Sequence, residues 1–189
     1  AAPYSTFDET FQAADWEHHV LVNTAPPATL TTTQRPFGGD PGAYKQGLHS
    51  FPMGGVVWAH VDRSFVYDPA ALGPIGSGEI SFSMRVESGS GTWGGDPNNP
   101  GTPCRVLVEP GGSSYSAPVH GYFVQQGDGW LWLSFPVVEG DLGQVVDCNT
   151  VGAGLDFSGA PMRFGYISKN STTNVTTCTR TWGVDNFRV

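Results

Sequence analysis

Residues 127–135 read GDGWLWLSF, a turn signal followed by a run in which tryptophans alternate with leucines and a phenylalanine. Successive side chains of a β-strand point to opposite faces. The two leucines and Phe135 would therefore share one face, and Trp130 and Trp132 would share the other. Both faces are apolar, so the stretch predicts a strand that is either covered on both sides or shows an aromatic surface to a ligand.

Short strands of this kind are predicted along most of the chain. Turn-forming stretches such as GGDPG, EPGGSS and QGDG separate them. The predicted strands are Leu48–Phe51, Gly55–Arg63, Glu79–Glu87, Arg105–Glu109, Val119–Gln125, Trp130–Pro136, Met162–Ser168 and Trp182–Val189. With 26 glycines and 15 prolines in 189 residues, the sequence predicts one all-β domain over residues 1–189, a two-sheet antiparallel β-sandwich of jelly-roll type.

The balance of charges argues against nucleic acid as a partner. The formal net charge is -8, and lysine occurs only at Lys45 and Lys169, so no basic cluster is available to neutralise phosphates. No stretch approaches the roughly 20 apolar residues that span a bilayer. The chain begins AAPYSTF without methionine, as expected after cleavage of a signal peptide or removal of an initiator methionine. Together with a composition rich in threonine, serine, glycine and asparagine, this start predicts a secreted, extracellular protein.

A sugar-binding surface needs a flat aromatic face with planar polar groups beside it. The turn QGDG predicts a hairpin between the strands 119–125 and 130–136. In the corresponding register, Phe123 lies opposite Trp132 and Gln125 lies opposite Trp130. The candidates on the non-core faces of their strands are Trp132, Phe123, Gln125, Trp130, Trp58, His60 and Arg85.

A tryptophan that follows a glycine-rich turn is often a packing residue. We expect Trp130 to pack at the turn, so the sugar-platform hypothesis rests mainly on Trp132. For Trp132 the alternative is that a long loop covers this outer face of the sheet.

Two motifs lie near the ends of the predicted fold, GGDPGAY at 38–44 and GVDNFRV at 183–189. With the acidic segment FDETF near the N-terminus, they resemble secreted jelly-roll domains, among them carbohydrate-binding modules of polysaccharide-degrading enzymes and laminin IV-type domains. Asp40 stands where the GGNPG pattern of such domains has asparagine. The resemblance implies a structural calcium ion that ties the N-terminal strand to the final one through carboxylates and backbone carbonyls.

Strand alternation places Asp185 on the same face as Phe187, toward the core. A buried carboxylate costs several kcal/mol unless it is paired or metal-bound. We therefore predict that Asp185 binds Ca²⁺, which prefers 6–8 oxygen ligands, together with Glu9 or Asp8 and with Asp40 from the GGDPG loop. The alternatives are an exposed aspartate at the strand end, or one that backbone N–H groups hold.

Three cysteines, Cys104, Cys148 and Cys178, are too few for a disulfide scaffold and lack the spacing of a metal site. If the strands run up and down in turn, Cys104 and Cys178 lie at the same end of the sandwich, and we predict a disulfide between them. The connection between residues 138 and 157 is also long enough to reach elsewhere. The odd cysteine would be available for an intermolecular bridge.

Catalytic motifs are absent from the sequence. It holds no G-x-S-x-G elbow, no H-E-x-x-H and no recognisable carboxylate pair of a glycosidase. The leading hypothesis is a secreted, non-catalytic domain that binds a polysaccharide or other glycan, or mediates cell-surface adhesion. One alternative is a self-associating subunit of an extracellular sheath, filament or capsid decoration, whose second apolar face makes subunit contacts. A further alternative is a polysaccharide-active enzyme.

Overall fold

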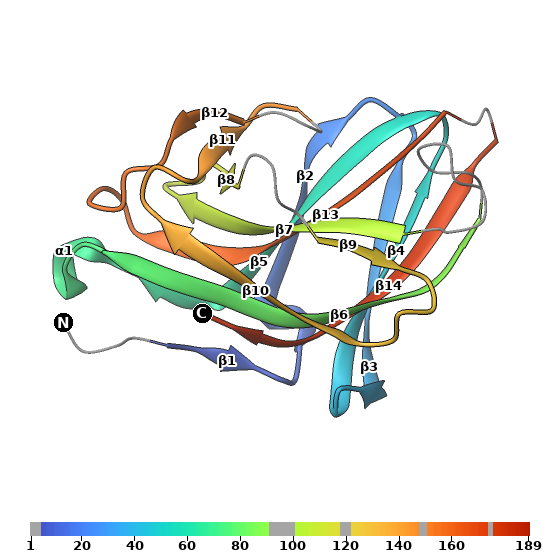
Figure 1. Ribbon diagram of the computed structural model, residues 1–189, viewed down its shortest axis with the longest axis horizontal. Coiled ribbons are helices and arrows are strands. Elements are labelled where there is room, and N and C mark those ends of the chain that lie inside the picture. Colours follow the sequence, from blue (N-terminus) through green and yellow to red (C-terminus); the bar gives the residue numbers. More distant parts are fainter. Residues whose placement is uncertain (1–4, 91–100, 118–121, 148–150, 174–175) are drawn as a thin grey trace.

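The computed structural model describes residues 5–90, 101–117, 122–147, 151–173 and 176–189. Two antiparallel sheets pack face to face in this part of the chain (Figure 1). Neither described helix, the 3-10 turn η1 (Ala13–Asp15) or α1 (Pro69–Leu72), is long or apolar enough to cross a membrane. The predicted all-β sandwich is confirmed.

The first sheet consists of six of the described strands. Its order is β10 (Leu131–Val138), β6 (Ser77–Ser90), β14 (Cys178–Arg188), β4 (Gly42–Phe51) and β3 (Thr29–Gly39), and β1 (Phe7–Asp8) pairs with β14 beside this path. On β10, Leu133 and Phe135 are buried, as predicted, because they pair with the inward-facing Phe82 and Ile80 of β6.

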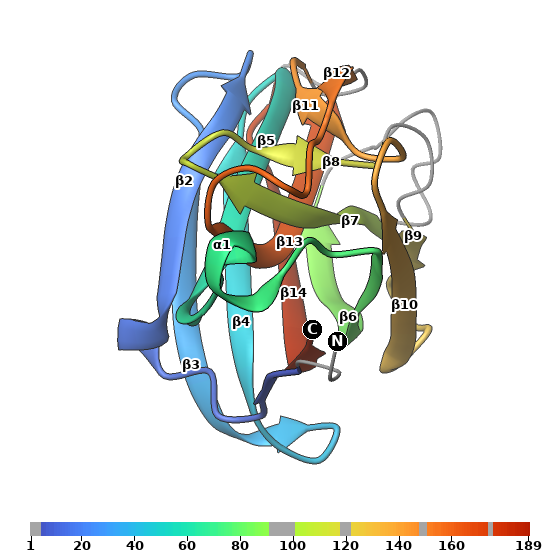
Figure 2. The same cartoon turned by 90° about the vertical axis from the view of Figure 1, so that its left-hand side faces the viewer.

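The second sheet consists of eight described strands. Its order is β12 (Val151–Gly154), β11 (Gly143–Val145), β8 (Tyr115–Ser116), β7 (Gly101–Pro110), β13 (Met162–Thr172), β5 (Gly54–Tyr67) and β2 (Trp16–Asn23), and β9 (Tyr122–Gln125) pairs with β7. This sheet is strongly curled, and Figure 2 shows β7 and β8 crossing the direction of β2 and β5.

The predicted hairpin between 119–125 and 130–136 is wrong. Strand β9 pairs with β7 of the second sheet, whereas β10 pairs with β6 of the first sheet. The turn at 126–130 therefore carries the chain from one sheet to the other. The physical reason is that the apolar faces of β10 and β6 match residue by residue, and this long-range pairing decides the partner.

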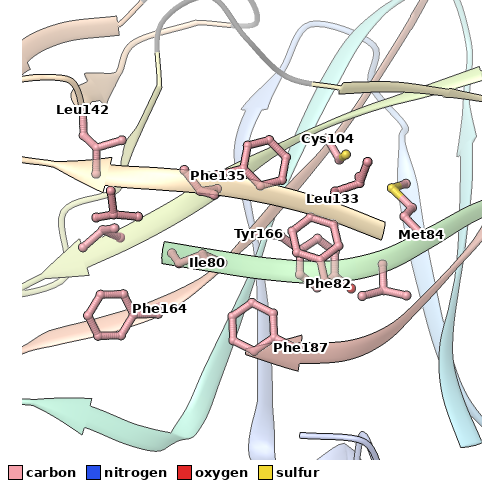
Figure 3. Packing of buried hydrophobic residues seen from close by; sticks show 14 of the residues in the cluster. Ile80, Phe82, Met84, Cys104, Leu133, Phe135, Leu142, Phe164, Tyr166 and Phe187 are labelled. Atoms are coloured by element: carbon pink, nitrogen blue, oxygen red, sulfur yellow. The ribbon is translucent and has the colours of Figure 1, made fainter. Parts of the chain in front are cut away.

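Aromatic rings fill the space between the sheets (Figure 3). Phe82 of β6 lies between Phe135 and Tyr166, with ring centroids 5.6 and 5.3 Å away, and Phe187 of β14 lies 6.4 Å from it. Each fully buried side chain of this size contributes roughly 1.5–3 kcal/mol. This core fixes the relative position of β6, β10 and β14, whose outer faces carry the candidate site.

The second sheet is apolar on its outer face as well as on the face that it turns toward the first sheet. Val57, Ala59 and Val61 of β5 are buried there with Leu107 and Ile167, and partly buried residues of β2 and β11 pack against them. Strand β5 is thus covered on both sides, which is why its sequence shows no clearly polar face.

The predicted Cys104–Cys178 disulfide is wrong, since both residues are free and buried. Cys104 lies in the main core, where its thiol is 3.6 Å from the carbonyl oxygen of Tyr122. Cys178 lies in a separate cluster with Phe51, and its thiol is 3.5 Å from the hydroxyl of Thr172. The strands do not simply run up and down in turn, so the two cysteines do not meet. Cys148 lies outside the described residues.

Candidate functional site

The outer face of the first sheet presents Trp132 to solvent. Trp132 of β10 pairs with Ser83 of β6, while its neighbours on the strand pair with the core-facing residues Phe82 and Met84. The side chain of Trp132 therefore points away from the core, and 49% of the residue is exposed. The predicted alternation is confirmed, and none of the described loops buries this tryptophan.

Trp132 forms one wall of a groove with a volume of about 520 Å³. The groove is lined by Ser5, Thr6, Phe7, Glu79, Ser81, Trp132, Arg188 and Val189. The opposite wall comes from β1, where Phe7 is 46% exposed. The strand β1 is held in place by its pairing with β14, which sets Phe7 beside Arg188.

Arg188 lies between the two aromatic walls. Its guanidinium carbon is 4.3 Å from the ring centroid of Phe7 and 5.2 Å from that of Trp132. Such cation–π contacts use the faces of the guanidinium group. Its N–H groups lie in the plane of the group and stay available for hydrogen bonds. Within the described ranges, no carboxylate lies within ion-pairing distance of Arg188. Arg188 can therefore donate hydrogen bonds to a ligand in the groove.

A β-bulge in β14 gives Arg188 this position. The register shifts between Asp185 and Arg188, and Asn186 has a φ of 55°. One extra residue changes the alternation, so Phe187 enters the core while Asp185 and Arg188 both face outward. The prediction that Asp185 and Phe187 share a core-side face is wrong for this reason.

Asp185 is buried although it lies on the outer face, because the tip of the β3–β4 hairpin covers it. Its carboxylate accepts hydrogen bonds from the backbone N–H groups of Asp40 and Asn186, the latter at 2.8 Å. Burial raises the pKa of Asp185, and the charges of Asp40 and Glu9 add to this rise. The hydroxyl of Ser83 donates to the Asp40 carboxylate at 3.0 Å.

These oxygen atoms fit the calcium hypothesis only in part. Asp40 and Asp185 come together, but the Asp8 carboxylate accepts hydrogen bonds from Trp16 Nε1 at 2.8 Å and from the backbone of Thr10 and Phe11. No group of three or more His, Cys, Asp or Glu side chains among the described residues is placed to hold a metal ion. The backbone hydrogen bonds to Asp185 match the alternative arrangement, and the calcium ion stays a prediction.

A second aromatic and arginine cluster lies on the same outer face. The guanidinium carbon of Arg85 is 4.6 Å from the ring centroid of Trp130 and 4.9 Å from that of Tyr44. Glu87 holds both partners, accepting hydrogen bonds from Arg85 and from the hydroxyl of Tyr44, each at 2.7 Å. A side chain at Gly183 would come within 2.9 Å of both rings, so only glycine lets them lie over β14. Trp130 is a packing residue, as expected, and Arg85 is tied to Glu87.

The other predicted ligand residues lie elsewhere. Phe123 and Gln125 belong to β9 in the second sheet, where they pair with Pro103 and Gly101 and not with β10. His60 faces the interior.

The ring of His60 stacks on that of Tyr166, with the two centroids 4.5 Å apart. Trp58 packs partly buried against the cluster around Phe51. The structure thus brings together Trp132, Trp130 and Arg85 on one face, and it separates them from the other four candidates.

Charged residues on the second sheet pair with one another. Arg163 binds Glu17 at 2.7 Å and Glu109 at 3.0 Å, and His19 lies 3.0 Å from Glu109. Glu109 is only 1% exposed. A buried carboxylate of this kind needs its partners, so we interpret this cluster as structural.

Comparisons with known proteins agree with this description of the fold. No protein-family model and no curated protein matches the sequence. Among solved structures, the chain is similar to the family 11 carbohydrate-binding module of a cellulosomal cellulase of Clostridium thermocellum, with a TM-score of 0.54 and 11% identity. That similarity covers 100% of this chain and 95% of that one.

A structure of the family 11 module from Clostridium thermocellum in complex with a β-1,3-1,4-mixed-linked tetrasaccharide gives a TM-score of 0.53 at 12% identity, covering 100% and 96% of the two chains. A third structure, described as explaining the promiscuous specificity of carbohydrate-binding modules of the β-sandwich superfamily, gives 0.52 at 12% identity over 99% of this chain and 62% of that one. The chain therefore has the β-sandwich fold of carbohydrate-binding modules. The similarity to family 11 modules extends over its whole length and confirms the resemblance noted in the sequence.

Proposed function

We propose that this chain is a non-catalytic carbohydrate-binding domain whose ligand lies in the groove between Trp132 and Phe7. The observation that carries the proposal is the pair of half-exposed aromatic rings on opposite walls, with Arg188 held between them. The fold supports the same function, since a module of similar fold has been solved with a mixed-linked tetrasaccharide.

The composition of the groove suits a sugar chain. Aromatic rings cover the apolar C–H faces of pyranose rings, and polar groups at the edge bind the hydroxyls. Here Arg188 supplies donors, Glu79 supplies acceptors, and Ser81 lies beside them on β6. The volume of about 520 Å³ falls within the range of small-ligand sites, roughly 300–1,000 Å³. An oligosaccharide segment is therefore a suitable ligand.

We also propose that the domain acts outside the cell, attached to a polysaccharide or to a glycan-bearing surface. A calcium ion near Asp40 and Asp185 would be structural, since these carboxylates belong to the β3–β4 tip and the β14 bulge. Neither residue lines the groove that we assign to the ligand.

Isothermal titration calorimetry with a panel of polysaccharides that includes β-1,3-1,4-glucan tests the proposal. Trp132→Ala removes one wall of the groove, and we expect it to weaken binding at least about tenfold, since loss of an aromatic contact and its buried area is worth 1.4 kcal/mol or more. Phe37→Ala is the matched control, because Phe37 is 79% exposed but does not line the groove. Absence of millimolar binding to every polysaccharide, or equal affinities of wild type and Trp132→Ala, would refute the proposal.

A further inference from the structure

A small pocket opens at the edge of the sandwich between β2 and β3. These are the edge strands of the two sheets on that side, so no further strand closes the gap between them in the described structure. The pocket has a volume of about 100 Å³. It is lined by Phe11, Ala13, Trp16, His18, Thr32, Thr33, Gln34 and Lys45. Lys45 of β4 forms part of its inner end and is only 3% exposed.

A chain of hydrogen bonds runs from the far side of the core toward this pocket. Asn170 Nδ2 donates to His49 Nδ1 at 2.6 Å, and His49 Nε2 lies 3.0 Å from Ser168 Oγ. Ser168 Oγ lies 2.7 Å from His60 Nε2, and His60 Nδ1 lies 3.1 Å from His18 Nδ1. If each group donates to the next one, every histidine in the chain is neutral and has one proton. His18 then receives the last hydrogen bond on its Nδ1 lone pair.

Lys45 lies at the end of this chain. Its Nζ is 3.4 Å from His18 Nδ1, the same lone pair that accepts from His60. An ammonium group has three N–H donors to place. Among the residues that the structure describes, no carboxylate lies within ion-pairing distance of Lys45. The ring of Trp16, whose centroid is 4.1 Å from Nζ, offers only a π face.

The free amine fits these surroundings better than the ammonium. If instead His18 Nδ1–H donates to His60 Nδ1, that nitrogen has no lone pair left for Lys45, and an ammonium again finds no acceptor there. In both directions the ammonium has more donors than acceptors. Burial acts in the same sense and outweighs the opposing charges of Asp8 and Asp62, so the pKa of Lys45 lies well below its usual value.

We propose that Lys45 is a nucleophilic amine that binds small aldehydes covalently, as an imine, in this pocket. The amine nitrogen attacks the carbonyl carbon and forms a C–N bond, the C=O electron pair moves to oxygen, and one nitrogen proton passes to that oxygen to give a carbinolamine. Loss of the hydroxyl with one nitrogen proton releases water and leaves a C=N bond, so neither an oxidant nor a reductant takes part. A pocket of about 100 Å³ limits the aldehyde to roughly two to four carbon atoms.

Reductive trapping tests the proposal on the wild-type protein. The folded protein is incubated at pH 7 with acetaldehyde and cyanoborohydride, and peptide mapping by mass spectrometry gives the alkylation rate at each amine. The chain offers an internal reference, because its only lysines are Lys45 and Lys169.

We expect Lys45 to react at least about tenfold faster than Lys169, since each unit of pKa depression raises the free-amine fraction about tenfold. In guanidinium chloride the two rates should become equal. Folded protein in which Lys45 reacts no faster than Lys169 would overturn the proposal.

Two variants test whether the aldehyde enters through the pocket. Ala13 lines the pocket from the exposed turn η1, and its neighbour Ala14 is exposed in the same turn but does not line it. Ala13→Trp should slow alkylation of Lys45 several-fold with no effect on Lys169, and Ala14→Trp should change neither rate. Equal rates in the two variants would show entry by another route and contradict the assignment. Trp132→Ala should leave the rate at Lys45 unchanged, because the glycan groove is a separate site.

Discussion

Acid is predicted to destabilise this domain through the histidines buried between its sheets. Burial lowers the pKa of His49 to about 3 and the pKa of His60 well below its usual value. In the unfolded chain both side chains titrate near 6.5. Because the folded state has the lower pKa, the unfolded state takes up protons first. The stabilising contribution is complete above about pH 6.5 and is lost as the pH falls toward 3.

The size of the effect follows from these pKa directions. At pH 5.5 an unfolded histidine is about 90% protonated, which stabilises the unfolded chain by about 1.4 kcal/mol per residue. His49 and His60 together should therefore lower the free energy of unfolding by about 3 kcal/mol between pH 7.5 and 5.5. This is a large share of the 5–15 kcal/mol that is typical of a folded domain.

Urea denaturation followed by tryptophan fluorescence at pH 7.5, 6.5 and 5.5 measures the effect. His49→Gln replaces the imidazole with an amide, which can still form hydrogen bonds but does not titrate. We expect its free energy of unfolding to fall by about 1.4 kcal/mol less than that of the wild type over this range. Other titrating groups cancel in this difference. A His49→Gln variant whose free energy of unfolding falls as much as that of the wild type would refute the argument, since His49 would then titrate alike in both states.

Three further predictions concern the packing, the carboxylates and the cysteine thiols. Gly47→Ala should lower the free energy of unfolding by about 3 kcal/mol in the same urea experiment, because the added carbon would lie 2.1 Å from the ring of Trp182; a variant of wild-type stability would show that the ring can move aside. Chelation with EDTA should lower the melting temperature of the wild type by several degrees but not that of Asp185→Asn, and an unchanged wild-type melting temperature would count against the calcium prediction. Alkylation with iodoacetamide in guanidinium chloride without reductant should label both Cys104 and Cys178, as intact-mass and peptide analysis would report, whereas an unlabelled pair would show a disulfide.

Local alternation was enough to orient the side chains of β10, but not those of β14, where a bulge shifts the register before Arg188. The pattern around Trp132 predicted which residues of β10 enter the core, and the structure confirms it, because the period of two is set by the backbone of a single strand. The same pattern could not predict the partner of β10. Pairing with β6 depends on residues some fifty positions away, and a turn signal such as QGDG is compatible with a hairpin or with a crossing between sheets.

The edge strands β2 and β3 escaped prediction for a related reason. The inner face of β2 carries His18 and that of β3 carries Thr32 and Gln34, which read as polar positions. The hydrogen-bond partner of His18 is His60 of another strand, so no local apolar pattern marks this edge of the sandwich. Phe7 and Arg188 were missed as site residues because only the pairing of β1 with β14 brings them together.

The pairing of Thr6 with Val189 has a practical consequence for anyone who makes fusions of this domain. The backbone N–H of Thr6 donates to Val189 at 3.0 Å, and that of Val189 donates to Thr6 at 3.2 Å. Both residues also line the groove beside Trp132. A reporter joined directly to Val189 thus starts at the rim of the proposed sugar site, and a short linker would place it over the groove. Labels intended to leave binding intact belong on the β3–β4 hairpin near Phe37, which does not line the groove.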